Sequence, residues 1–140
     1  MRHRVAEAGL EGDIVVESAG TGSWHIGDPA DRRASAEARA RGVAMDGAAR
    51  QFVAGDLARF DLILAMDERN AADLRALTRG VDDAPEVRLL REFDPTARGD
   101  LSVPDPYYGG PEGFTEVFDM VDRACLGLIA HLRAGPLAGR

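Results

Sequence analysis

Cysteine is almost absent from this chain of 140 residues, which contains only Cys125. A single thiol excludes an internal disulfide bond and a cysteine-rich metal cluster, and it is typical of a reducing compartment. The chain also lacks any run of about 18 apolar residues, the length that spans a bilayer. Its first ten residues lack the apolar core of a secretion signal. We therefore expect a cytoplasmic protein without a membrane partner.

Basic residues are also fewer than acidic ones. The chain has 17 Lys and Arg against 24 Asp and Glu, a formal net charge of -7, and its basic residues are scattered among acidic ones. This distribution argues against a nucleic acid or an anionic lipid as partner. The length, with 45% hydrophobic residues, suits one globular core, so we expect residues 1–140 to form a single domain.

Helical patterns and short apolar runs alternate along the chain. The patterns predict helices at about 1–8, 32–41, 68–78 and 114–132, and strands at 13–18, 61–66 and 87–90. Asp31 and Asp67 suit the N-caps of the second and third helices, and Gly9 and Gly42 suit the ends of the first two. This alternation predicts an α/β domain with a parallel sheet.

The segments that follow the strands are the expected location of functional residues, because ligands of open parallel sheets bind beyond the carboxyl ends of the strands. The first such segment starts at Ser18 and contains Trp24, and the second contains Asp67. The third leads into a long loop that contains Asp105. We therefore expect these side chains at one edge of the sheet.

Asp105 lies between Pro104 and Pro106, which restrict the backbone on both sides of it. A carboxyl group held in one place suits a general acid. Two tyrosines follow directly, and three aromatic rings in this region suit the walls of a slot for a planar substrate ring: Trp24, Tyr107 and Tyr108.

Five motifs occur in order along the chain: SAGT-x-x-WHIG-x-x-x-D-x-R, ARQ, DLILAMD-x-x-N, VPDPYYGG and F-x-x-VFDMV-x-x-AC. Their order and spacing resemble those of the low-molecular-weight protein tyrosine phosphatases and of the closely similar arsenate reductases. The resemblance that they carry covers nearly all of residues 3–132. The resemblance implies a three-layer, doubly wound parallel sheet. It also implies hydrolysis of phosphotyrosine, in a protein or a small aryl phosphate, through a cysteinyl-phosphate intermediate and without a metal or cofactor.

The resemblance carries over to individual residues of this chain. It implies that Asp105 is the general acid, that Ser18 shapes the phosphate-binding loop and that Asp67 lies close behind this loop. It also implies that Trp24, Tyr107 and Tyr108 form the walls of the substrate slot. The chain departs from the family at Gly47, where many members have a histidine that supports the loop network.

The nucleophile of the resembled family lies in a Cys-x5-Arg-Ser/Thr loop, and this chain has no such motif. Cys125 is followed six positions later by His131 rather than Arg, and it lies on the apolar stripe of the last helix, so we expect a core thiol. The resemblance places Met1 inside the family's first helix. We therefore expect an N-terminally truncated sequence that lacks the first central strand and the loop, on the order of twenty residues, and no activity of these 140 residues alone.

Other interpretations of the same residues remain open. Asp105 could be a turn residue between two prolines, Trp24 a packing residue and Asp67 only a helix cap. The whole chain could be a non-catalytic, phosphatase-like binding module. Arsenate reduction is a further alternative that the motifs do not separate from phosphatase activity.

Overall fold

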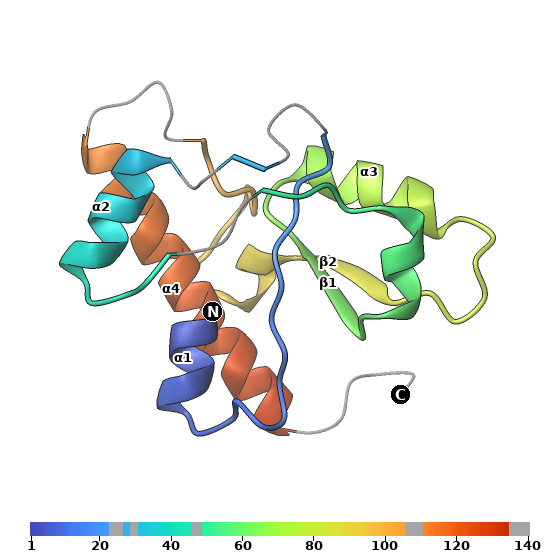
Figure 1. Ribbon diagram of the computed structural model, residues 1–140, viewed down its shortest axis with the longest axis horizontal. Coiled ribbons are helices and arrows are strands. Elements are labelled where there is room, and N and C mark those ends of the chain that lie inside the picture. Colours follow the sequence, from blue (N-terminus) through green and yellow to red (C-terminus); the bar gives the residue numbers. More distant parts are fainter. Residues whose placement is uncertain (23–26, 29–30, 46–48, 106–110, 135–140) are drawn as a thin grey trace.

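The computed structural model describes residues 1–22, 27–28, 31–45, 49–105 and 111–134. Figure 1 shows α1, α2 and α4 gathered at one end of the molecule and two strands with α3 at the other. The helices and strands are α1 (Arg2–Glu7), α2 (Arg32–Ala40), β1 (Leu62–Ala65), α3 (Glu68–Thr78), β2 (Glu86–Leu89) and α4 (Pro111–Ala134), with short 3-10 helices η1 (Ala54–Ala58) and η2 (Leu90–Phe93).

The helix starts follow from local chemistry. Asp31 accepts a hydrogen bond at its carboxylate from the backbone N–H of Arg33, at 2.8 Å, and so caps α2. Asp67 accepts one from the N–H of Asn70, at 2.7 Å, and caps α3. Each bond satisfies an amide that the helix itself leaves without a partner. Gly9 and Gly42 have positive φ and end the first two helices, so these predictions are confirmed.

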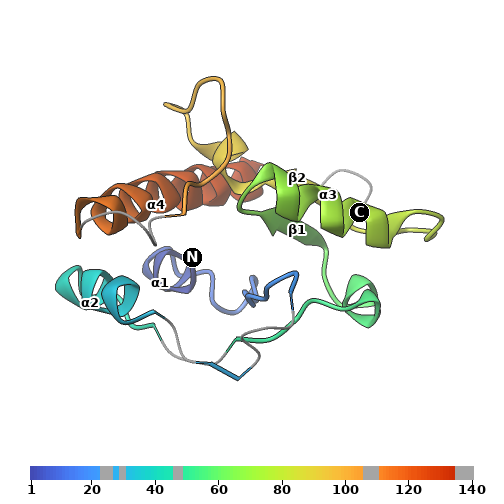
Figure 2. The same ribbon diagram turned by 90° about the horizontal axis from the view of Figure 1, so that it is seen from above.

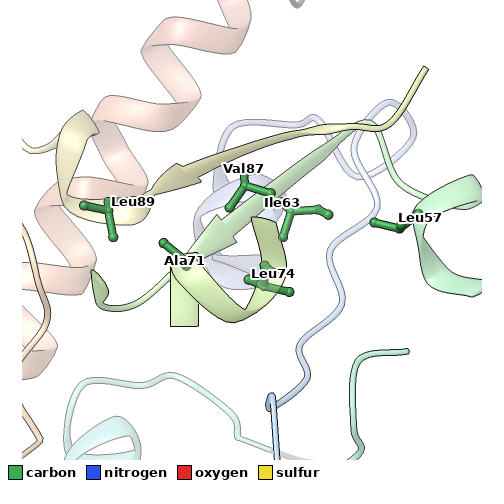
Figure 3. Close-up of a cluster of buried hydrophobic side chains, with 7 residues drawn as sticks. Leu57, Ile63, Ala71, Leu74, Val87 and Leu89 are labelled. Atoms are coloured by element: carbon green, nitrogen blue, oxygen red, sulfur yellow. The ribbon is translucent and has the colours of Figure 1, made fainter. Parts of the chain in front are cut away.

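β1 and β2 pair in parallel, with Leu62 opposite Glu86 and Ala65 opposite Leu89. One face of the pair packs against α3. Figure 3 shows this hydrophobic cluster, which consists of Leu57, Ile63, Ala65, Ala71, Leu74, Val87 and Leu89. Because side chains alternate along a strand, the other two β1 residues, Leu62 and Leu64, point away from this cluster.

The second cluster joins the sheet to α4. Its buried members are Leu90, Phe93, Ala124 and Leu128, and Leu62 and Leu64 pack against it. β1 is therefore covered by apolar side chains on both faces, as its continuous apolar sequence predicts. No helix in the described part of the chain is both long and apolar enough to cross a membrane.

Ion pairs attach α1 and α2 to α4. The Arg4 guanidinium donates to both carboxylate oxygens of Asp122, each at 2.7 Å. Arg41, which follows α2, contacts the Asp119 carboxylate at 2.7 Å, and its guanidinium lies over the ring of Phe118. Figure 2 shows α1 and α2 next to one another along one side of α4.

The predicted strand at residues 13–18 is wrong. The backbone from Ile14 to Ala19 forms no strand, and Val15 is 82% exposed. β-branched residues favour an extended backbone, but a strand also needs a hydrogen-bonded neighbour, and no strand in the described residues pairs with this segment. Figure 1 shows it as an irregular trace. Pairing begins only at Gly20, which forms an isolated parallel bridge with Gln51.

Candidate functional site

The loop that carries Asp105 is joined to the carboxyl end of β1. We call residues 100–105 the acid loop. Within it, the backbone N–H of Val103 donates to the carbonyl oxygen of Met66, at 2.7 Å. The hydroxyl oxygen of Ser102 accepts a hydrogen bond from the N–H of Glu68, the first residue of α3, at 3.1 Å. Asp105 follows two residues after Val103 and is exposed.

The loop that begins at Gly20 reaches the same end of the sheet. The side-chain amide of Asn70 donates to the hydroxyl oxygen of Thr21, at 3.3 Å. The side-chain amide of Gln51 donates to the Thr21 carbonyl oxygen, also at 3.3 Å. The first turn of α3 therefore contacts both the Thr21 loop and the acid loop, which places Thr21 and Asp105 on segments held by one helix terminus.

The predicted site residues have different positions in the structure. Asp67 is half-buried at the start of α3 and is a helix cap, while Ser18 is exposed on the irregular segment before Gly20. Asp67 and Asp105 lie on segments that touch through Val103 and Met66. The remaining predicted residues, Trp24, Tyr107, Tyr108 and Gly47, lie outside the described residues.

A buried carboxylate fixes the chain just before β1. The Asp56 side chain is 5% exposed and binds Arg50 at 3.1 Å and Arg59 at 2.9 Å. The hydrogen bond from the Val53 N–H, and then that from Arg50, lower the pKa of Asp56 below its ordinary value. Arg59 also binds the Glu17 carboxylate, at 3.0 Å. This network ties the irregular segment that carries Ser18 to η1.

Cys125 is buried in α4, 3% exposed. Its burial raises the pKa of the thiol above its ordinary value. A nucleophilic cysteine needs the opposite environment, because the thiolate is the reactive form. The expectation of a core thiol is therefore confirmed. In the described part of the chain, no three His, Cys, Asp or Glu side chains are arranged to hold a metal ion.

Sequence reasoning missed Thr21, Gln51 and Ser102 as residues that connect the loops. Asn70 lies in the D-x-x-N motif, and its position one turn after the cap Asp67 was a usable signal. Ser102 lies only three residues before Asp105, but its partner Glu68 is 34 positions away. Contacts of this range depend on tertiary structure and leave no periodic pattern in the sequence.

Comparison with known proteins gives a family match over residues 1–136, to the low molecular weight phosphotyrosine protein phosphatases. A low molecular weight protein-tyrosine-phosphatase of Streptomyces coelicolor is 48% identical over 133 residues, which cover 94% of this chain and 81% of the relative.

Solved structures are also similar to the chain. A protein tyrosine phosphatase from Entamoeba histolytica superposes with a TM-score of 0.88 at 33% identity, covering 99% of this chain and 86% of the other. A Drosophila arginine phosphatase superposes with a TM-score of 0.85 at 27% identity, covering 94% of this chain and 84% of the other. These structures share an α/β fold with a parallel sheet, and the chain belongs to the low molecular weight phosphotyrosine protein phosphatase family.

Proposed function

We propose that this chain supplies the acid-loop half of a protein tyrosine phosphatase site, with Asp105 as general acid and phosphotyrosine as substrate. The observation that carries the proposal is the hydrogen bond from Val103 to Met66, which holds the acid loop at the carboxyl end of β1. Ligands of parallel sheets bind at that end. Membership of the family supports phosphotyrosine as the substrate.

The proposed chemistry has two steps. A cysteine thiolate attacks phosphorus, the bond between phosphorus and the phenolic oxygen breaks, and the Asp105 carboxyl gives its proton to that oxygen. Water then attacks the phosphocysteine while the Asp105 carboxylate takes a proton from it. Phosphate leaves and the thiolate is restored, so the reaction consumes only water and the phosphate ester.

Within this proposal, Trp24, Tyr107 and Tyr108 form the slot for the phenol ring. Ser18 supports the phosphate-binding loop, and Asp67 supports the same region from the start of α3. Residues 1–140 then form one domain with a three-layer, doubly wound sheet. The packing of α3 and α4 on opposite faces of β1 supports the layered arrangement.

The nucleophile of this reaction is not Cys125, because its thiol is buried and its pKa is raised. We therefore propose that the catalytic thiol lies outside these 140 residues and that they are inactive alone. Purified 140-residue protein is expected to give neither turnover nor a burst of p-nitrophenol from p-nitrophenyl phosphate. A normal burst from this protein contradicts the proposal.

The role of Asp105 is tested in a fusion in which a segment with the Cys-x5-Arg-Ser/Thr motif precedes Met1. Asp105→Ala is expected to lower kcat about 10²- to 10⁴-fold for aryl phosphates with poor leaving groups, and much less for good ones, which depart without a proton. Equal slowing of all phenols contradicts a general acid.

The substrate class is tested with the same fusion. Peptides with phosphotyrosine and with phosphoarginine, and arsenate with a thiol reductant, are compared by kcat/KM. Phosphotyrosine is expected to be the preferred substrate. Preference for phosphoarginine, or reduction of arsenate alone, overturns this substrate assignment.

A further inference from the structure

The acid loop is held by more than its backbone. Arg91 lies in η2, directly after β2, and its side chain reaches this loop. One terminal nitrogen, Nη1, donates to the carbonyl oxygen of Asp100 at 3.1 Å and to that of Ser102 at 2.9 Å. A single guanidinium therefore binds two backbone carbonyls that lie two residues apart in the loop.

Part of the Arg91 guanidinium is removed from water. Its Nε is buried and has no hydrogen-bond partner among the described residues. A guanidinium that is partly removed from water gains more from each remaining bond, because a charged donor in a less polar setting binds a carbonyl more strongly than a neutral donor does. Moving the loop away would remove both carbonyl partners of this guanidinium.

Ser102 is bonded both to Arg91 in η2 and to the first amide of α3. Its carbonyl oxygen accepts from Arg91, its hydroxyl oxygen accepts from the N–H of Glu68, and its own N–H donates to the Asp100 carboxylate at 2.9 Å. The next residue, Val103, is bonded to Met66. Each polar group of Ser102 thus connects the loop to η2, to α3 or to the loop itself.

We propose that Arg91 and Ser102 form a clamp that fixes the acid loop between η2 and the first turn of α3 and so positions Asp105. Both are positioning residues. The clamp holds Ser102, and the next residue, Val103, is bonded to Met66 two residues before Asp105. Pro104 then limits how far the backbone at Asp105 departs from that anchor. The part that concerns Asp105 rests on the proposed function, whereas the clamp itself does not.

The clamp is tested by amide hydrogen exchange, measured by NMR on the ¹⁵N-labelled 140-residue protein. Ser102→Ala removes the acceptor of the Glu68 amide, whose exchange is expected to become about three- to tenfold faster, the effect of losing one hydrogen bond. Ser102→Thr keeps the hydroxyl and is expected to restore the parental rate. The Asn70 amide, bonded to Asp67, is the internal reference and stays unchanged.

Arg91→Met is expected to accelerate exchange of the Val103 amide by a similar factor. Arg98→Met is the matched control, because Arg98 lies just before the acid loop and binds only the carbonyl oxygens of Pro95 and Ala97 among the described residues. It is expected to leave Val103 and Glu68 unchanged. Unchanged exchange in Ser102→Ala and Arg91→Met, or equal acceleration by Arg98→Met, overturns the clamp.

Kinetics of the fusion then test what the clamp does for Asp105. Arg91→Met and Ser102→Ala are expected to lower kcat for poor leaving groups about tenfold with KM changed less than about twofold, and Ser102→Thr is expected to retain parental kcat. A fall that is equal for all phenols shows that the clamp does not act through Asp105. If Asp105→Ala itself gives no leaving-group dependence, the proposed function fails, while the exchange data still decide the clamp.

Discussion

Asp94 has a fully buried carboxylate side chain, at the end of η2 next to α4. Its oxygens accept hydrogen bonds from the N–H and the hydroxyl of Thr96, at 2.9 and 2.8 Å, and from Arg123 Nε, at 3.3 Å. Burial by itself raises the pKa of Asp94, but these bonds outweigh it, so the pKa lies below the ordinary value. The folded state therefore favours the charged form.

This shift predicts how stability depends on pH. The unfolded chain holds its Asp proton up to about pH 4, so the contribution of Asp94 is present above that pH and is lost as pH falls through the lower folded-state pKa. Asp94→Asn is expected to reduce the free energy of unfolding by about 1–3 kcal/mol at pH 7. The difference should shrink below about pH 4.

Urea unfolding of both proteins from pH 7 to pH 3 measures this effect. Asp73→Asn, which changes an exposed carboxyl on α3, is the control and should change stability by less than about 0.5 kcal/mol. A difference between Asp94→Asn and the parent that is constant with pH contradicts the assigned charged state.

At the scale of elements, the contact between α4 and η2 depends on Gly127. A Cβ atom built there would overlap the Phe93 carbonyl oxygen and lie 2.9 Å from its carbonyl carbon, both of them backbone atoms. Alanine favours a helix by about 1 kcal/mol over glycine, yet Gly127→Ala is expected to destabilise the fold by about 2–3 kcal/mol because the two elements must separate.

Thermal and urea unfolding of Gly127→Ala test this contact. Gly55→Ala provides the same change where a Cβ would meet nothing within 4 Å, and it is expected to be nearly neutral. A stabilised Gly127→Ala protein would show that helix propensity, and not the approach of η2, decides this position.

The sequence predicts local features of these elements better than it predicts contacts between distant residues. The sequence predicts Asp31 and Asp67 as caps because a cap bond spans two or three residues. The apolar runs predict the two observed strands. The run at residues 13–18 is richer in β-branched residues but forms no strand, because pairing depends on a distant neighbour. Sequence separation also limits what can be predicted of the site. Asp105 is recognisable between its two prolines, whereas the hydrogen bond from Asn70 to Thr21 spans 49 positions and leaves no local pattern.

At the scale of the whole molecule, two apolar clusters lie on the two faces of β1, and the segment Ile14 to Ala19 contributes little to either. Val15 is 82% exposed, whereas Ile63, of similar β-branched chemistry, is 7% exposed within the cluster against α3. The free energy of burial follows the apolar area that is removed from water. These two β-branched apolar positions should therefore respond very differently to a polar substitution.

Val15→Thr is expected to change the free energy of unfolding by less than about 0.5 kcal/mol, as for surface positions. Ile63→Thr loses apolar contact and buries a hydroxyl, and it is expected to cost about 2–4 kcal/mol. Urea unfolding of the two variants, with Ile63→Val as a milder control at about 1 kcal/mol, gives the comparison. A loss of more than about 1 kcal/mol in Val15→Thr would mean that residues 13–18 are covered in solution, as a paired strand would be, because only a buried valine makes a threonine costly.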